Sequence, residues 1–214
     1  MATGSTTSTH LDGRFKKVFS LHIMLDNLKK YDIVLASGSP RRRELLEGLG
    51  LSFRVEVIKG IKECYPPTLP VDEVPEYLSR LKSHAYNVTG NELLITADTV
   101  VVLGGELIGK PHSEQEAREM LHKLSGNTHT VVTGVTIATV HGSASFSCKS
   151  QVEFAVLTDE EIDYYVDRYQ PLDKAGSYGI QDWIGYMGIK GINGSFYNVM
   201  GLPVQRLYSV LKSM

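Results

Sequence analysis

A strand, a turn and the start of a helix lie together in residues 31–49, and no other stretch constrains the fold as much. Its sequence is YDIVLASGSPRRRELLEGL. The short, β-branched run 33–36 predicts a buried strand, and the turn-forming residues 37–39 end it. Ser39 is a favourable N-cap and Pro40 suits the first position of a helix. The stretch therefore predicts a strand that leads directly into the N-terminus of a helix.

Three arginines, Arg41, Arg42 and Arg43, occupy the first turn of this predicted helix. Cations there oppose the helix dipole by roughly a few tenths of a kcal/mol each, whereas a bound anion is stabilised. The unfavourable charge predicts a phosphate site, and we expect Arg42→Ala to weaken the binding of a phosphorylated ligand more than folding. The alternative is that the arginines are solvated surface charges, partly offset by Glu44 and Glu47 at helical spacing.

The size and charge of the chain limit its class. It has 214 residues, 42% of them hydrophobic, which suffices for one domain with a sizeable core. Residues 1–23 begin with a polar stretch and are predicted to be a disordered leader or tag, so we expect a single catalytic domain over 24–214. The net charge of -2 provides no overall basic field of the kind that favours nucleic-acid binding.

The cysteines and the hydropathy pattern bear on the compartment. Cys64 and Cys148 are far apart and form no CxxC pair, so the sequence indicates neither a disulfide framework nor a structural zinc site. No apolar run approaches the length of a membrane span, and the first residues lack the apolar core of a signal peptide. These features predict a soluble cytoplasmic protein without a membrane partner.

Hydrophobic periodicity predicts most of the remaining elements. Alternation over 53–57 indicates a half-buried strand, and the apolar run 93–98 indicates a strand that ends at Asp98. The other predicted elements are a hairpin of 100–103 and 106–108, helices that contain 74–85 and 204–211, helices that begin at the capping boxes Ser113/Glu116 and Thr158/Glu161, a long hairpin of 130–139 and 147–156, and a glycine-rich loop region over 176–194.

Residues 104–110 spell GGELIGK and match the first seven positions of a phosphate-binding Walker A loop. The next position should carry Ser or Thr to bind Mg2+, but it is Pro111, which cannot ligate a metal. The flanking residues also predict a hairpin and not a strand, loop and helix. The match therefore does not indicate a P-loop nucleotidase.

Several charged residues lie at or beside predicted element boundaries. Asp98 follows an apolar strand, where open α/β sheets place their ligands. Hydrolysis of a nucleotide anhydride needs oxygen ligands for Mg2+, cations for the phosphates and a carboxylate that activates water. The candidates of these types are Arg41, Arg42, Glu63, Lys82, Asp98 and Lys110. Each also has a structural explanation: solvated lysines, a surface acid at Glu63, and a turn former at Asp98.

Several separated motifs resemble the Maf family of nucleoside triphosphate pyrophosphatases. They are SGSPRR at 37–42, ADTV at 97–100, GKP at 109–111 and DKAGSYGIQ at 173–181, and they occur in the family's order. The resemblance implies an α/β, Maf-like (ITPase-like) fold, in which helices flank a twisted mixed β-sheet around a deep cleft. It also implies a homodimer that splits nucleoside triphosphates between the α and β phosphates with a divalent metal cation, Mg2+ or Mn2+.

The resemblance assigns roles to individual residues. It implies that Asp98 accepts a proton and that Glu63, Lys82 and Lys110 are polar active-site residues, of which the two lysines act in catalysis. The oxygen chemistry of Glu63 and Asp98 predicts that these two residues bind the metal. The branch that hydrolyses dTTP and UTP is the most similar, and Arg41, Thr99 and Gln181 match its specificity positions. The full set of predicted substrate-binding residues is Ser37, Ser39, Arg41, Arg42, Thr99 and Gln181.

A second class of function stays open from the sequence. The basic SGSPRRR turn could dock nucleic acid or act in a regulator of septum formation. A nucleic-acid surface usually carries several basic clusters with interleaved aromatic residues. This chain has only one basic cluster. The acidic balance therefore favours a nucleotide hydrolase that binds no nucleic acid.

Overall fold

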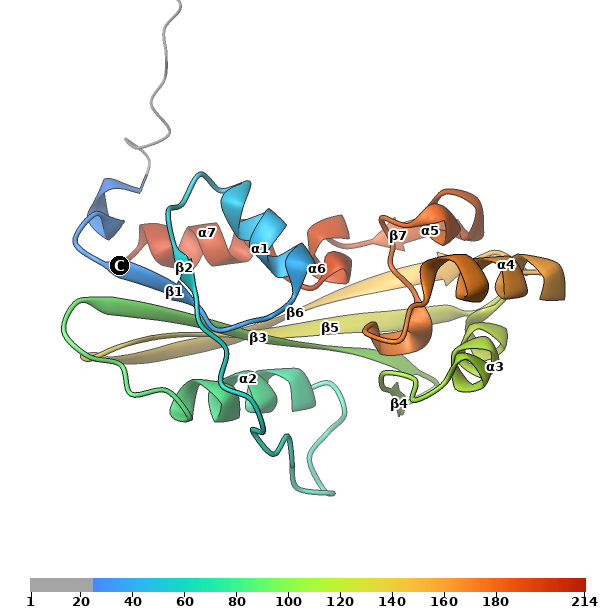
Figure 1. Cartoon of the computed structure of the whole chain (residues 1–214), viewed down its shortest axis with the longest axis horizontal. Helices are drawn as coiled ribbons and strands as arrows, with labels where there is room; N and C mark the ends of the chain where they lie inside the picture. The colour runs from blue at the N-terminus through green and yellow to red at the C-terminus, as the bar shows by residue number, and fades with distance from the viewer. Residues whose placement is uncertain (1–24) are drawn as a thin grey trace, which may run out of the picture.

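A seven-stranded mixed β-sheet forms the centre of the molecule, as seen in a computed structural model that describes residues 25–214 (Figure 1). The predicted leader, residues 1–23, lies outside the described residues. The strand order is β2-β1-β3-β5-β6-β7, and β4 pairs with β3 beside this path. Parallel pairs join β1 to β2 and to β3, and the other pairs are antiparallel. Helices flank the sheet, so the predicted α/β class with a twisted mixed sheet is confirmed.

The first strand and helix form where the sequence predicts them. Strand β1 is Asp32–Leu35 and helix α1 is Pro40–Glu47, with Pro40 in its first turn. The Ser39 side chain accepts a hydrogen bond from the backbone N–H of Arg42, as an N-cap does. The short 3-10 helix η2, Asp26–Leu28, precedes β1. The local turn chemistry was therefore sufficient to position this helix.

The strand predicted over 53–57 is shorter than expected. Strand β2 is only Arg54–Val55 and pairs with β1 alone, at the edge of the sheet. Val55 and Val57 keep 37% and 49% of their surface exposed. The prediction of a half-buried strand from this alternation was therefore wrong. An edge strand of two residues has little sheet or helix to pack against.

Strand β3 corrects the prediction for 93–103. The structure has one continuous strand, Glu92–Leu103, in place of a strand that ends at Asp98. Its first part pairs with β1, whose register ends at Leu35 opposite Ile95, and β5 pairs with it from Leu94 to Val102. Because β5 continues the ladder, the chain needs no turn at Asp98. Asp98 therefore lies in mid-strand, just beyond the carboxyl end of β1.

Hairpins form the other half of the sheet. Strand β4, Glu106–Ile108, returns from β3 across the Gly104-Gly105 turn, which confirms the predicted hairpin and removes the Walker A alternative. The long predicted hairpin is confirmed as β5, Thr128–Thr139, and β6, Gly142–Phe154. Strand β7, Ile189–Asn193, completes the sheet beside β6.

Two helices begin at the predicted capping residues, with one difference. Helix α4, Asp159–Tyr169, has a complete capping box between Thr158 and Glu161. Helix α3, Glu114–Leu124, has its N-cap bond from the Glu116 N–H to Ser113, but the Glu116 carboxylate accepts from the backbone N–H of His112 instead of Ser113. The box at α3 is thus only half formed.

The helices divide between the two faces of the sheet and its end. Helix α2, Val74–His84, covers one face, while α1, α6 and α7 cover the other, and α3 and α4 pack together at one end (Figure 1). An added Cβ at Gly134 in β5 would lie 2.2 Å from the Glu76 backbone nitrogen, so only glycine admits α2 this close to the sheet. No helix among residues 25–214 is both long and apolar enough to cross a bilayer.

The glycine-rich region over 176–194 is more ordered than predicted. It contains the end of the 3-10 helix η3, Ala175–Ser177, then helix α5, Trp183–Gly188, and strand β7. Helix α6, Phe196–Met200, follows, and the predicted C-terminal helix is α7, Val204–Lys212. Strand β7 and helices α5 and α6 are too short to show a hydrophobic period, and tertiary contacts such as the pairing of β7 with β6 define them instead.

Candidate active site

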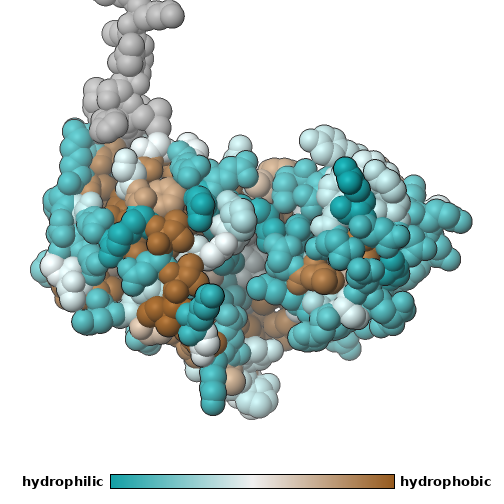
Figure 2. All heavy atoms as spheres, viewed as in Figure 1, coloured by the Kyte–Doolittle hydropathy of each residue, from teal (hydrophilic) through white to brown (hydrophobic). Residues whose placement is uncertain are grey.

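A cleft of about 470 Å3 opens beyond the carboxyl end of β1, between α1, α2, β3 and the segment 173–181. Figure 2 shows the surface hollowed between the part that holds α1 and β2 and the part that holds η3 and α4. The structure brings every residue predicted for the site to the lining of this one cleft: Ser37, Ser39, Arg41, Arg42, Glu63, Lys82, Asp98, Thr99, Lys110 and Gln181. Their chemical roles remain predictions.

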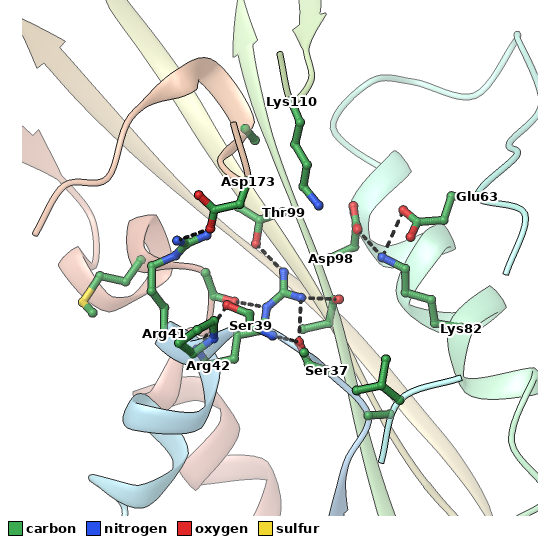
Figure 3. A pocket seen from close by; sticks show the side chains of 18 of the residues that line it. Ser37, Ser39, Arg41, Arg42, Glu63, Lys82, Asp98, Thr99, Lys110 and Asp173 are labelled. Carbon is green, nitrogen blue, oxygen red and sulfur yellow. Dashed lines mark hydrogen bonds and ion pairs between the residues drawn. The ribbon is translucent and has the colours of Figure 1, made fainter. Parts of the chain in front are cut away.

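Two carboxylates meet one ammonium group on the α2 side of the cleft (Figure 3). Lys82 Nζ donates to Asp98 Oδ1 at 2.6 Å and lies 3.1 Å from Glu63 Oε2. Asp98 is 9% exposed, whereas about half of the Glu63 side chain is exposed. Because α2 packs closely on the sheet, Lys82 reaches Asp98 across the gap between the two elements. Asp98 is therefore fixed in position, while Glu63 lies in the loop between β2 and α2.

The Arg42 guanidinium group lines the cleft and hydrogen-bonds to backbone carbonyls and hydroxyl groups from separate parts of the chain. Its Nε donates to the Gly201 carbonyl oxygen at 2.9 Å, and Nη1 donates to the Ala97 carbonyl at 2.9 Å and to Ser37 Oγ at 3.3 Å. Nη2 donates to Thr99 Oγ1 at 3.0 Å. Burial lowers the pKa of Arg42, and the attraction of Asp98 opposes this shift. Four of the five guanidinium N–H groups thus serve the protein itself.

The Thr99 hydroxyl belongs to a hydrogen-bond chain with a fixed direction. Thr133 Oγ1 donates to the Asn198 carbonyl oxygen at 3.0 Å, so its single proton is used there. Thr99 Oγ1 must therefore donate across the 3.0 Å contact to Thr133, while it accepts from Arg42. A hydroxyl in this state can offer a ligand only an acceptor lone pair.

The three arginines of the first helical turn diverge, which corrects the view of them as one cluster. Arg41 forms an ion pair of 2.8 Å with Asp173 across the mouth of the cleft (Figure 3). Arg42 is turned inward as described above. Arg43 is exposed and does not line the cleft. The expected concentration of three guanidinium groups on one phosphate therefore does not form.

Three further residues of the cleft were not anticipated as site residues. Asp173 pairs with Arg41, Tyr178 lines the cleft, and the Gly201 carbonyl accepts from Arg42. Asp173 and Tyr178 both lie in the DKAGSYGIQ motif, so the motif itself was the only signal for them. Gly201 carried no signal, because its contribution is a backbone carbonyl.

The hydroxyl group of Tyr178 is hydrogen-bonded to a buried histidine. His129 is 1% exposed, and its Nε2 lies 2.7 Å from the Tyr178 hydroxyl oxygen. Burial lowers the pKa of His129 to about 4 and raises that of Tyr178, so at pH 7 the hydrogen bond joins a neutral imidazole to a neutral phenol. This bond sets where the Tyr178 ring stands in the cleft wall.

We expect the buried histidine to make folding stability depend on pH. The unfolded chain binds a proton on His129 below its ordinary pKa of about 6.5, whereas the folded protein does so only near pH 4. The unfolded state therefore binds more protons in this window, and stability falls as the pH decreases, by up to about 3 kcal/mol. Urea unfolding at pH 7 and 4.5 measures the loss. His129→Phe should show a smaller difference between the two pH values, and an equal difference would contradict the assignment.

Gln181 presents an unusual pair of polar atoms in the cleft wall. Its Nε2 donates to Asp182 Oδ1 at 3.2 Å. Its Oε1 is buried, and no donor within residues 25–214 reaches it. A buried carbonyl oxygen without a donor is costly, by roughly 1–3 kcal/mol. Gln181 lines the cleft, so a small movement of its side chain would offer this oxygen as an acceptor for an N–H group of a ligand.

The described residues contain no group of three or more His, Cys, Asp and Glu side chains that could hold a metal alone. Glu63 and Asp98 do supply two carboxylates around one point, which Lys82 occupies with its ammonium group. Mg2+ commonly takes one or two carboxylates and completes its shell with substrate phosphates and water. The donor set thus fits a cation that binds together with a phosphorylated substrate.

Comparison with known proteins places the chain in one group. The family described as Maf-like protein matches residues 32–214. A protein of Phocaeicola vulgatus called dTTP/UTP pyrophosphatase is 58% identical, covering 89% of this chain and 100% of its own. One of the same name from Bacteroides thetaiotaomicron is 55% identical with the same coverage. The solved structure of a HAM1 protein from Coxiella burnetii is 16% identical, with a TM-score of 0.43, over 86% of this chain and 100% of that chain.

Proposed function

Because the chain belongs to the Maf family, we propose that it hydrolyses dTTP and UTP, and related modified pyrimidine nucleotides, to the nucleoside monophosphate and pyrophosphate. The observation that carries this proposal is the contact of Lys82 with both Asp98 and Glu63, inside a cleft whose other wall carries Arg41. A carboxylate held beside cations is what the hydrolysis of a phosphate anhydride requires.

Asp98 acts as the general base in this proposal. Lys82 holds Oδ1, which leaves the second carboxylate oxygen for a water molecule. As Asp98 removes a proton, the water oxygen bonds to the α-phosphorus. The bond from that phosphorus to the oxygen that bridges to the β-phosphate breaks, and pyrophosphate leaves with the electron pair. The products are a nucleoside monophosphate and pyrophosphate.

The cations of the cleft bind the triphosphate. Lys110 projects into the cleft from the segment after β4, on the side of Asp98 away from Lys82 (Figure 3). Lys110 and Lys82 can therefore neutralise phosphate charge on both sides of the general base. Ser37 and Ser39, at the N-terminus of α1, lie where backbone N–H groups and the helix dipole favour an anion.

A divalent cation, Mg2+ or Mn2+, belongs to the proposal. Glu63 and Asp98 would hold it together with the phosphates, and it would withdraw charge from the reacting phosphate. The exposed position of Glu63 lets this side chain adjust to the substrate and cation.

The direct test is release of pyrophosphate from a panel of nucleoside triphosphates with Mg2+ or Mn2+, measured with a coupled inorganic pyrophosphatase. The proposal expects dTTP and UTP to be split, and it expects the nucleoside monophosphate product, measured directly without the coupling enzyme, to be absent when a chelator removes the metal. Release of phosphate alone, without the coupling enzyme, would contradict cleavage between the α and β phosphates.

Gln181 is the residue that we propose recognises the base by hydrogen bonding. Uracil and thymine carry an N–H donor at N3 beside the O4 acceptor, whereas cytosine carries an acceptor at N3. The orphan carbonyl of Gln181 can accept from that N–H. We expect kcat/KM for dTTP and UTP to exceed that for CTP by about tenfold to a hundredfold.

Gln181→Ala should narrow this preference, chiefly by lowering activity on dTTP and UTP. The measurement is kcat/KM for all three nucleotides in both proteins. If the variant loses the same factor on every nucleotide, Gln181 only supports the loop, and base reading must be assigned elsewhere.

The alternative of a nucleic-acid or septum-related docking patch is less well supported. Of the three arginines in the basic turn, Arg41 is paired with Asp173 and Arg42 is used internally, so only Arg43 is fully presented to a partner. Binding of labelled single-stranded DNA at physiological salt would support this alternative if Arg43→Ala abolished it.

The assembly and location also belong to the proposal. The resemblance to Maf proteins supports a homodimer in the cytoplasm. Light scattering after size exclusion gives the mass in solution, and a value near 23.7 kDa would instead indicate a monomer.

A further inference from the structure

Asp182 stands where a helix cap is expected but does not act as one. It is the N-cap residue of α5, and within the described chain its carboxylate makes no hydrogen bond to the backbone of that helix. Aspartate is a favoured N-cap because its side chain usually accepts such a bond. The carboxylate is turned instead toward the Gln181 side chain and into the protein.

Two donors and one cation hold the carboxylate in this orientation. The buried Tyr165 hydroxyl donates to Asp182 Oδ2 at 2.8 Å, and Gln181 Nε2 donates to Oδ1 at 3.2 Å. Lys174 Nζ lies 3.9 Å from Oδ2. The Tyr165 oxygen itself accepts from the Gly179 N–H, and burial raises the tyrosine pKa, so its proton remains available to Asp182.

The pair also has little room to rearrange. An added Cβ at Gly179 would lie 2.5 Å from Asp182 Oδ2 and 2.9 Å from Gln181 Nε2. The two side chains therefore pack directly on the glycine backbone, where no other residue type would fit without moving them. This close packing favours one arrangement of the Gln181 amide.

A carboxylate imposes a direction on a neighbouring amide. It only accepts hydrogen bonds, so the NH2 end of Gln181 must face Asp182 and the carbonyl end must face the other way. The carbonyl oxygen is the atom that has no donor within residues 25–214. Without Asp182, the two ends of the amide could exchange by rotation of the side chain, and the cleft wall would offer a donor as readily as an acceptor.

We propose that Asp182 is a positioning residue for base specificity, which fixes the Gln181 amide so that it accepts from the imide N–H of uracil or thymine and disfavours cytosine. The proposal rests on the proposed nucleotide hydrolysis. It adds a residue that acts through Gln181 and touches neither the phosphates nor the reacting atoms.

Asp182→Asn tests the direction of the amide. The Tyr165 proton would draw the oxygen of the new amide, which leaves its NH2 group facing Gln181. Gln181 would then turn its carbonyl to position 182 and its NH2 group to the base. We expect kcat/KM for UTP to fall about tenfold to a hundredfold, while that for CTP stays equal or rises. Loss of folding alone would lower both by one factor.

Two further variants keep the test decisive. In Asp182→Ser, the serine suits a helix N-cap, and its hydroxyl can either donate or accept a hydrogen bond. The Gln181 amide is then free to adopt both orientations and is not forced into the reversed one. We expect its UTP/CTP ratio to lie between those of the wild type and Asp182→Asn. Asp159→Asn makes the same change at an exposed carboxylate of α4 and should keep the wild-type ratio.

The outcomes separate this proposal from the function on which it rests. If the wild type splits no pyrimidine triphosphate, the proposed function is wrong. If the wild type prefers UTP and both folded position-182 variants keep that preference, the role of Asp182 is overturned while the function stands. A ratio that falls in the order wild type, Asp182→Ser, Asp182→Asn supports the proposal.

Discussion

Asp98→Asn is expected to lower kcat for dTTP and UTP by about 100-fold to 10,000-fold while the protein stays folded. The amide has nearly the same shape as the carboxylate, but it neither accepts a proton from water nor balances the charge of a metal. Lys82 would still find the amide oxygen at the position of Asp98 Oδ1 and would keep its contact with Glu63. The measurement is steady-state pyrophosphate release, with circular dichroism to establish folding.

The matched control is Asp32→Asn, the same substitution on the neighbouring strand β1. Asp32 is exposed, forms an ion pair of 2.6 Å with Arg54, and does not line the cleft. Its kcat should equal that of the wild type. A folded Asp98→Asn protein with wild-type turnover would end the assignment of Asp98 as the general base.

Arg42→Ala is expected to lower the free energy of unfolding by about 3 kcal/mol. The substitution removes the donors of the Ala97 and Gly201 carbonyl oxygens, and buried acceptors without donors are costly. It also releases the Thr99 hydroxyl that Arg42 fixes. This reverses the expectation from the sequence, in which the loss of a charge opposed to the helix dipole would spare folding.

Arg43→Ala is the control for this second prediction. Arg43 neighbours Arg42 in the same helical turn but is exposed, so its removal should change stability by less than about 0.5 kcal/mol. A loss of about 3 kcal/mol in a domain of this size corresponds to a decrease in Tm of roughly 6 to 12 °C. If the two variants had equal urea midpoints, the internal hydrogen bonds of Arg42 would not stabilise the fold, and Arg42 would serve only to bind phosphate.

Elements whose cause is local could be predicted from the amino-acid sequence. Ser39 and Pro40 start α1, and Thr158 with Glu161 starts α4, because each cap joins residues only a few positions apart. The long β5–β6 hairpin also followed from its own run of β-prone residues. The residue types needed for phosphate chemistry were likewise recognisable, and they do meet in one cleft.

The contacts that each of these residues makes depend on the tertiary fold. Asp98 lies in mid-strand because β5, more than thirty residues later, continues the ladder past it. Arg42 holds the carbonyl of Gly201, 159 positions away, so its neighbours in the sequence could not reveal that it faces inward. The orientation of the Gln181 amide depends on Asp182, which Tyr165 of α4 holds. Sequence patterns report propensity and burial over a few residues, whereas the direction of a hydrogen bond depends on partners that only the folded chain brings together.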